Sequence, residues 1–201
     1  MKKLTVLLCT CLLLASVFWL ASVWSDRQVL NDQLLRLHVV ADSDSEEAQA
    51  QKRKVKDAVV AYLQEKMQNV ESLSQAVAFL EGELTQLQHI ARETLDAAGV
   101  ADPVTVSLER ESFPVRKYDT FTLPSGVYQS LRIVIGEGQG QNWWCVVFPS
   151  LCLPATSQGF KETATGAGFS DTLVNTLEEK PGYEIRFFFL DCFGWLQNLF
   201  S

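Results

Sequence analysis

Three glycines at alternate positions, Gly136, Gly138 and Gly140, precede two tryptophans in the stretch "GEGQGQNWWCVVF". A glycine-rich loop binds phosphate when it opens a helix, because the first backbone N–H groups of the helix then face the anion. No Lys-Ser or Lys-Thr pair follows these glycines, and the next residues form an apolar, aromatic run typical of a strand. We therefore interpret them as a hairpin loop between two strands, with no nucleotide or other cofactor.

Two cysteines flank the end of the same run. Cys145 and Cys152 are seven residues apart, which argues against a C-x-x-C redox centre or a zinc knuckle. Pro149 between them can turn the chain back, so one interpretation is a local Cys145–Cys152 disulfide and the other is two buried free thiols. Cys192 would then be left without a partner if the first two pair. Neither interpretation makes this segment catalytic.

His38 is the second candidate for chemistry. It precedes Asp42 and Asp44, a combination that suggests a metal site or a general base. A strand residue and the residues of the following turn diverge in space, however, unless the loop curls back, so we predict no metal site. A nucleophile such as Cys145 brought to His38 by the fold would make the chain a hydrolase, and this remains the alternative.

The N-terminus predicts export. Lys2 and Lys3 precede an uncharged stretch, residues 4–25, which is long enough to cross a bilayer. An uncleaved anchor and a cleaved signal peptide are both consistent with it, and both place the remainder outside the cytoplasm. Without the two lysines the net charge falls from −7 to −9, which excludes a typical nucleic-acid binder. The basic run at residues 52–56 is expected to be a solvated helix face.

The elements that must position these residues follow from periodicity. Residues 35–40 alternate as in a half-buried strand, and Asp44 with Glu47 predicts a capping box for a helix over about 45–69. A second amphipathic helix begins near Ser72 and ends before Gly99. Several strands follow, of which "NWWCVVF" is expected to be central because it is continuously apolar. The fold class is therefore α+β, with an N-terminal strand and two long amphipathic helices packed on an antiparallel-rich sheet.

The domain organisation has four parts. Residues 1–25 are the signal peptide or membrane anchor, and residues 26–153 are the core domain. Residues 154–182 are polar and rich in Gly, Thr and Ser, which predicts a flexible excursion with one short helix around 170–179. Residues 183–201 are expected to form a final strand and an aromatic tail, docked on the core or, alternatively, in contact with a membrane or partner.

Three ordered blocks resemble a known family. They are "LLRLHVVADSDSEEAQAQKRKVKDAVVAYL", "FPVRKYDTFTLPSGVYQSLRIVIGEGQGQNWWCVVFPSLC" and "YEIRF". Together they resemble stage II sporulation protein R of endospore-forming Gram-positive bacteria, over roughly residues 34–152 and again from Tyr183. The chain departs from that pattern at Asp42, where Asn is more usual, and in its aromatic C-terminus.

The resemblance implies a signalling protein that is not an enzyme. It implies export from the forespore into the space towards the mother cell, where the protein triggers a membrane-embedded aspartic protease of the mother cell that processes the sigma-E precursor. It assigns no individual roles to residues. Those carried over by motif are Arg36, His38, Asp42, Ser43, Asp44, Phe113, Pro114, Arg116, Tyr118, Gly136, Gly138, Gly140, Asn142, Trp143, Trp144 and Cys145.

A signalling protein needs a surface for its partner, and large aromatic groups on rigid turns are the best anchors. Adjacent strand residues point to opposite faces, so Trp143 and Trp144 should differ in burial. One candidate patch is Trp143 with Asn142 and the loop glycines, and the other is Arg36, His38, Asp42 and Ser43. Two other functions remain open: an extracytoplasmic hydrolase acting on cell wall or peptide, and a structural envelope protein anchored by residues 4–25.

Overall fold

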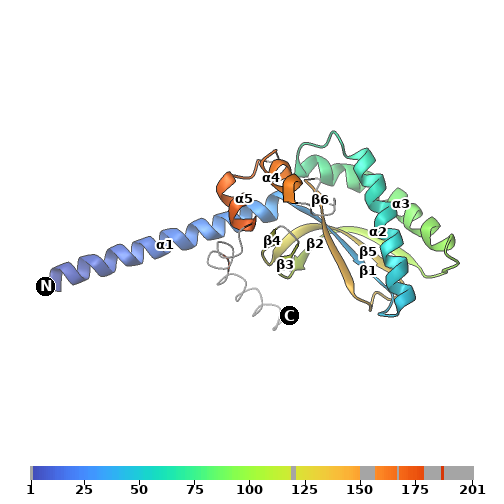
Figure 1. The fold of residues 1–201 in the computed structure, drawn as a ribbon, viewed down its shortest axis with the longest axis horizontal. Coiled ribbons are helices and arrows are strands. Elements are labelled where there is room, and N and C mark those ends of the chain that lie inside the picture. Colours follow the sequence, from blue (N-terminus) through green and yellow to red (C-terminus); the bar gives the residue numbers. More distant parts are fainter. Residues whose placement is uncertain (1, 119–120, 150–156, 167, 179–186, 188–201) are drawn as a thin grey trace.

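A computed structural model of the chain describes residues 2–118, 121–149, 157–166, 168–178 and 187 (Figure 1). The elements are α1 (Lys2–Gln33), β1 (Leu35–Val40), α2 (Glu46–Lys66), α3 (Leu73–Asp96), β2 (Val104–Phe113), β3 (Arg116–Lys117), β4 (Thr122–Leu123), β5 (Gly126–Ile135), β6 (Asn142–Phe148), α4 (Ser157–Gly166) and α5 (Asp171–Glu178).

The main sheet has four strands in the order β2-β5-β1-β6. Strand β1 is parallel to β5 and antiparallel to β6, and β2 is antiparallel to β5. This mixed, mainly antiparallel sheet with its helices confirms the α+β class. The predicted central position of β6 is wrong, because β6 lies at the edge of the described sheet. Its apolar run is explained by its last residues, Val146–Phe148, which are buried in the hydrophobic clusters on the two faces of the sheet.

Strand β1 is an internal strand covered on both faces. The alternation in its sequence predicts one exposed face, but every residue from Leu35 to Val40 is buried. Leu35, Leu37 and Val39 belong to the first hydrophobic cluster. Arg36 and His38, on the other face, are 0% and 5% exposed. The half-buried assignment is therefore wrong, because the alternating polar residues are covered by protein and not by solvent.

Helices α2 and α3 supply the first cluster, and their starting residues explain where they begin. Ser45 is the N-cap of α2, and its hydroxyl accepts a hydrogen bond from the Ala48 N–H at 3.1 Å. The predicted capping box at Asp44 is therefore one residue too early. Ser72 is confirmed as the N-cap of α3. Gly99 follows α3 with φ +74°, the left-handed conformation expected of a glycine just beyond a helix.

A second hydrophobic cluster lies on the opposite face of the sheet. Helices α4 and α5 contribute to it, with Leu173 and Val174 fully or nearly fully buried. Helix α5 confirms the short helix predicted near residues 170–179, whereas α4 was not expected in the presumed flexible excursion. Phe187 is buried and helical, which disagrees with a strand at that position. The rest of the predicted final strand and aromatic tail lies outside the described residues.

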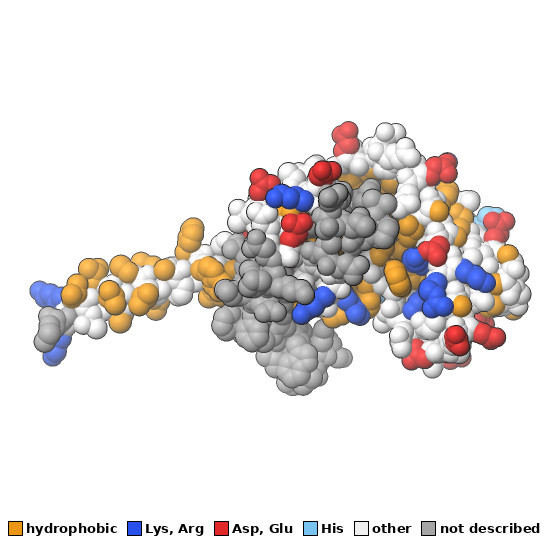
Figure 2. Space-filling model, viewed as in Figure 1, with side chains coloured by type: hydrophobic (Ala, Val, Ile, Leu, Met, Phe, Trp, Pro, Cys, Tyr) orange, Lys and Arg blue, Asp and Glu red, His pale blue; other side chains and the backbone are white. Residues whose placement is uncertain are grey.

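Helix α1 joins the projecting N-terminus to this second cluster. Its outer part extends away from the body and carries mainly hydrophobic side chains, with basic residues at the tip (Figures 1 and 2). By length and composition it can cross a membrane. The helix continues past the expected boundary at residue 25, and Val23 and Leu30 are buried in the second cluster. The last turns of α1 are therefore part of the folded domain.

Candidate functional site

The turn after β1 and the loop after β5 are held together by hydrogen bonds. The Asp42 carboxylate accepts from the Glu137 N–H at 2.9 Å, and the Asp44 carboxylate accepts from the Gln141 N–H at 2.7 Å. Two backbone hydrogen bonds join them, from Gln139 N–H to the Asp42 carbonyl and from Gly140 N–H to the Ala41 carbonyl. We call these four hydrogen bonds the loop clamp. The clamp joins the Asp42 end of one candidate patch to the glycine loop of the other.

The glycine-rich loop is a crossover and not a hairpin. Strands β5 and β6 flank β1 and do not pair with each other, so residues 136–141 must pass over the end of β1. The path is too close for larger residues. A Cβ on Gly136, which has φ +61°, would collide with the Asp42 side chain, and one on Gly140 would collide with the Ser43 carbonyl. The glycines therefore serve this close packing, and the hairpin interpretation is wrong.

Helix α2 holds the loop from the other side. Lys52 is only 4% exposed, and its amino group donates to the Gln141 carbonyl at 2.7 Å. Burial lowers the pKa of this amino group, and the neighbouring Arg53 charge lowers it further. The Lys56 amino group lies 4.7 Å from the centre of the Trp143 ring. The expectation of a purely solvated basic face is wrong at Lys52, because the loop crosses the helix there and its Gln141 carbonyl accepts a hydrogen bond from the lysine.

The two tryptophans point to opposite faces, as predicted. Trp143 is 38% exposed and lies over Lys56, whereas Trp144 is half-buried. The Trp144 ring stacks on His38, with ring centres 3.8 Å apart and planes 12° from parallel. Asn142, just before them, is exposed. The clamp therefore presents Asn142 and Trp143 at the surface, and Trp144 faces inward.

His38 connects strands on both sides of β1. Its Nδ1 is 2.7 Å from the Glu111 carboxylate, and its Nε2 is 2.8 Å from the Asn142 side-chain oxygen. Among the described residues its ring bonds to neither Asp42 nor Asp44, whose carboxylates accept instead from backbone N–H groups of the loop. In the part of the chain that the structure describes, no group of three or more His, Cys, Asp or Glu side chains is arranged to hold a metal ion.

Glu111 is a site residue that the sequence analysis missed. Burial raises the pKa of its carboxyl, but the hydrogen bond and charge of His38, with the charge of Arg132, more than offset this and hold the pKa below its ordinary value. The only sequence signal is the alternation of β2, which places Glu111 on the polar face of that strand. Such a face is normally solvated, so nothing local indicates that it turns towards His38.

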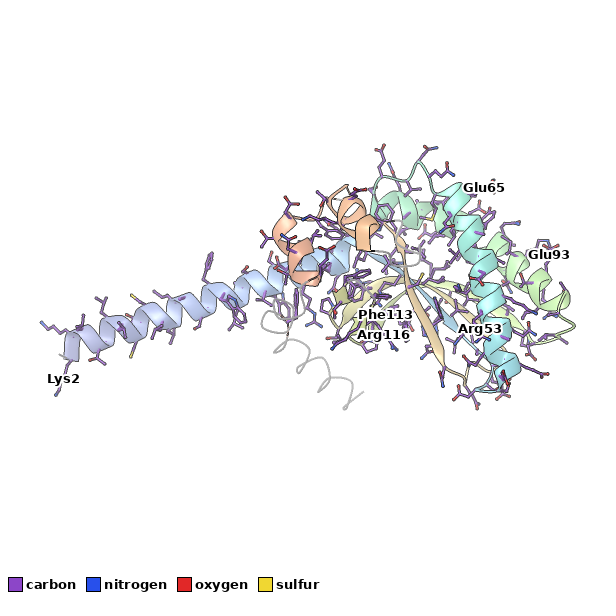
Figure 3. All side chains as sticks on the ribbon, in the orientation of Figure 1. Lys2, Arg53, Glu65, Glu93, Phe113 and Arg116 are labelled. Atoms are coloured by element: carbon purple, nitrogen blue, oxygen red, sulfur yellow. The ribbon has the colours of Figure 1, made fainter. Side chains whose placement is uncertain are left out.

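Arg36 lies below this network and is completely buried. Its guanidinium is 4.0 Å from the centre of the Phe113 ring and 5.0 Å from that of Tyr128, and it donates to the Tyr118 hydroxyl at 2.9 Å. Arg116 lies over Trp144 at 5.1 Å. Figure 3 shows Phe113 and Arg116 close together beside the sheet. Arg36 and His38 are thus internal residues. Their predicted contact with a partner stays a prediction and does not involve the exposed loop.

Cys145 is disulfide-bonded, and its partner lies outside the described residues. Pairing with Cys152 therefore stays a prediction. Cys145 is on the same face of β6 as Trp143, opposite to His38, and a sulfur in a disulfide is not a free thiolate nucleophile. The hydrolase arrangement of His38 with Cys145 is therefore wrong.

Comparisons with known proteins agree with the resemblance of the sequence blocks. The model of the Stage II sporulation protein R family matches residues 31–158, a region that contains the loop clamp, His38, Glu111 and Arg36. The chain is 30% identical over 191 residues to Stage II sporulation protein R of Bacillus subtilis (strain 168), covering 86% of this chain and 84% of that protein. No solved structure matches the chain. The chain therefore belongs to the stage II sporulation protein R family.

Proposed function

We propose that the chain is an exported signalling protein of endospore formation that activates a membrane-embedded aspartic protease of the mother cell, which then processes the sigma-E precursor. Membership of the family supports this role. The observation that carries it is the loop clamp, which holds the loop before β6 from both β1 and α2 and so fixes the exposed Asn142 and Trp143 at the start of β6. A rigid, pre-organised loop loses little conformational entropy when a partner binds it.

Helix α1 supports an extracytoplasmic location next to a membrane. Lys2 and Lys3 would stay on the cytoplasmic side, and the apolar residues 4–25 would cross the bilayer. From residue 25 to Gln33 the helix rises by only about 12 Å, so the domain would lie close to the outer leaflet. In a sporulating cell we expect this location to be the space between forespore and mother cell, facing the membrane of the proposed partner.

The contact surface in this proposal is the exposed side of the loop. Trp143 is the anchor, because a tryptophan buries a large apolar area and is over-represented among residues that dominate binding energies. The Lys56 amino group lies under its ring and supports it by a cation–π contact. Asn142 adds a polar group whose side-chain oxygen is also bonded to His38. His38 and Glu111 would thus keep the loop in its binding conformation and would not react themselves.

The test is reconstitution in a non-sporulating host. The full chain is expressed with the protease and the sigma-E precursor, and the cleaved fraction of the precursor is measured. Trp143→Ala is expected to lower cleavage at least about tenfold, as loss of a central anchor does. Val127→Ala, which removes another exposed apolar side chain, is the matched control and should leave cleavage unchanged.

Two results would contradict the proposal. Unchanged cleavage with Trp143→Ala, at equal protein level, would exclude this loop as the contact surface. Precursor cleavage that does not depend on the chain at all would exclude protease activation. Incubation of the purified chain with peptidoglycan is the separate test of the hydrolase alternative, in which His38→Gln should abolish any release of soluble fragments.

A further inference from the structure

The sheet face that carries Arg36 has several hydrogen-bond donors without an acceptor. Among the described residues, Nε and Nη1 of Arg36, Nε of Arg116 and Nε1 of Trp144 are buried nitrogens that make no hydrogen bond. None of the ion pairs between described residues includes Arg36 or Arg116. Three of these four donors belong to permanently charged guanidinium groups, and the described part of the same face also holds an unpaired buried acceptor, the Glu111 Oε2 atom.

These donors belong to one cluster. The Arg36 guanidinium lies 4.0 Å from the Phe113 ring centre, and the Phe113 ring is 4.6 Å from that of Trp144. The Arg116 guanidinium lies 5.1 Å from the centre of the Trp144 ring, so a continuous chain of contacts through Phe113 and Trp144 joins the two arginines. We call this set of residues, Arg36, Arg116, Tyr118 and Trp144, the donor cluster.

The donor cluster has a buried floor and a partly exposed rim. Arg36 is completely buried, whereas Arg116, Tyr118 and Trp144 are half-buried. Arg36 has one acceptor, the Tyr118 hydroxyl, and no carboxylate partner among the described residues, so the desolvation of its charge is only partly repaid. The aromatic rings of Phe113 and Tyr128 face the guanidinium, which leaves its in-plane N–H groups to bind an acceptor. In-plane donors match the planar carboxylate particularly well.

We infer that the donor cluster is a binding site for an oxyanion, namely a carboxylate carried by an acidic side chain of a partner polypeptide. Arg36 and Arg116 supply the positive charge, and the Trp144 indole N–H supplies a neutral donor. The inference rests on the proposed function in one respect, that the carboxylate belongs to the signalling partner. Trp144 lies in β6 two residues after Asn142 and on the same face of the sheet, whereas Trp143 points to the opposite face, so a partner segment bound at the donor cluster can extend to Asn142.

The test measures anion binding by the full chain alone, without the protease. The ¹⁵N-labelled chain is held in neutral maltoside micelles, and the indole N–H signal of Trp144, assigned with Trp144→Phe, is followed by NMR. The probes are the blocked peptides acetyl-Gly-Glu-Gly-amide and acetyl-Gly-Gln-Gly-amide, inorganic phosphate, and chloride at matched ionic strength. The Glu peptide is expected to shift the signal in a saturable way, and the Gln peptide and chloride are not.

Arg116→Gln keeps the fold testable, because Arg116 is half-buried and the change retains its size. It should weaken binding of the Glu peptide at least about tenfold, the effect of losing one charge-assisted hydrogen bond. Arg53→Gln on α2, remote from the cluster in Figure 3, is the matched control and should bind normally. No saturable shift with the Glu peptide, or tighter binding of phosphate than of the Glu peptide, would overturn the inference. Either result leaves the loop surface and its reconstitution test unaffected.

Discussion

The two faces of the sheet are built from the same strands but by different means. The face towards α2 and α3 is covered mainly by apolar side chains, such as Leu37, Leu87 and Ile133. The opposite face combines the second hydrophobic cluster with Arg36, His38 and Glu111. The first face is held together mainly by hydrophobic contact. The second carries buried charges that are only partly paired, which is more typical of a functional surface than of a scaffold.

The difference between the two faces predicts that substitutions on one face affect mainly stability and substitutions on the other affect mainly signalling. On the helix-covered face, a substitution acts through the apolar area it exposes and the cavity it leaves. On the opposite face and at the loop clamp, a substitution instead changes charge, hydrogen bonding and the position of the loop. Variants on the first face should therefore lower signalling only as far as they unfold the chain. Variants on the second should lower signalling at nearly normal stability.

The largest effect is expected on the helix-covered face. Leu87 is completely buried in the first cluster, so Leu87→Ala should lower the free energy of unfolding by about 2–5 kcal/mol. Urea unfolding followed by circular dichroism measures this. Gln86→Ala, at an exposed position on the same helix, should change it by no more than about 0.5 kcal/mol. An equal effect of both variants would contradict the assignment of the core face of α3.

The second prediction concerns the end of α1. Leu30 is buried in the second cluster, so Leu30→Ala should lower the free energy of unfolding by about 2 kcal/mol, the low end for such a change because a helix end can partly collapse. Leu20→Ala, exposed on the same helix, is the control. Both should still fractionate with membranes. No loss of stability with Leu30→Ala would show that the domain folds independently of α1.

The third prediction tests the loop clamp. Asp42→Ala removes the acceptor of the Glu137 N–H, which should cost about 1 kcal/mol of stability. The direct measurement is hydrogen exchange, which should accelerate at the amides of residues 137–141 and remain unchanged in α3. Glu81→Ala removes an exposed carboxylate elsewhere and serves as the charge control. Unchanged exchange in the loop would mean that Asp42 does not hold it.

The fourth prediction concerns the loss of stability at acidic pH. The pKa of Glu111 is held below its ordinary value, so its carboxylate stabilises the fold above about pH 4.5 and this contribution is lost as pH falls through the lower, folded-state pKa. Glu111→Gln should therefore reduce the loss of stability between about pH 5 and pH 3. Urea unfolding at each pH measures it. An identical pH dependence in variant and wild type would exclude the paired carboxylate.

The smallest effect on stability is expected at the exposed tip of the site. Trp143→Ala removes a partly exposed ring and its contact with Lys56, which should lower the free energy of unfolding by about 0.5 kcal/mol. The same variant is expected to have the strongest effect on signalling. A large loss of stability instead would make Trp143 a structural residue and would remove the distinction between the two faces.

The local features of this protein, such as helix ends and the orientation of neighbouring strand residues, could be predicted from its amino-acid sequence. Ser72 as a helix start, Gly99 beyond a helix end, and the opposite orientations of Trp143 and Trp144 follow from chain periodicity and capping, which act over a few neighbouring residues. The same holds for the apolar α1 and for the helix around residues 171–178. The family blocks also contain the whole loop clamp, which joins residues of the first block to residues of the second.

The order of the strands in the sheet could not be predicted from the sequence and is known only from the tertiary structure. It placed β1 inside the sheet and β6 at its described edge, turned the expected hairpin loop into a crossover above Asp42, and buried Lys52 beneath that loop. It also brought Glu111 to His38, residues 73 positions apart in the chain. Alternation specifies two faces of a strand but not what covers each of them. The polar face of β1 was therefore read as solvated, although protein covers it.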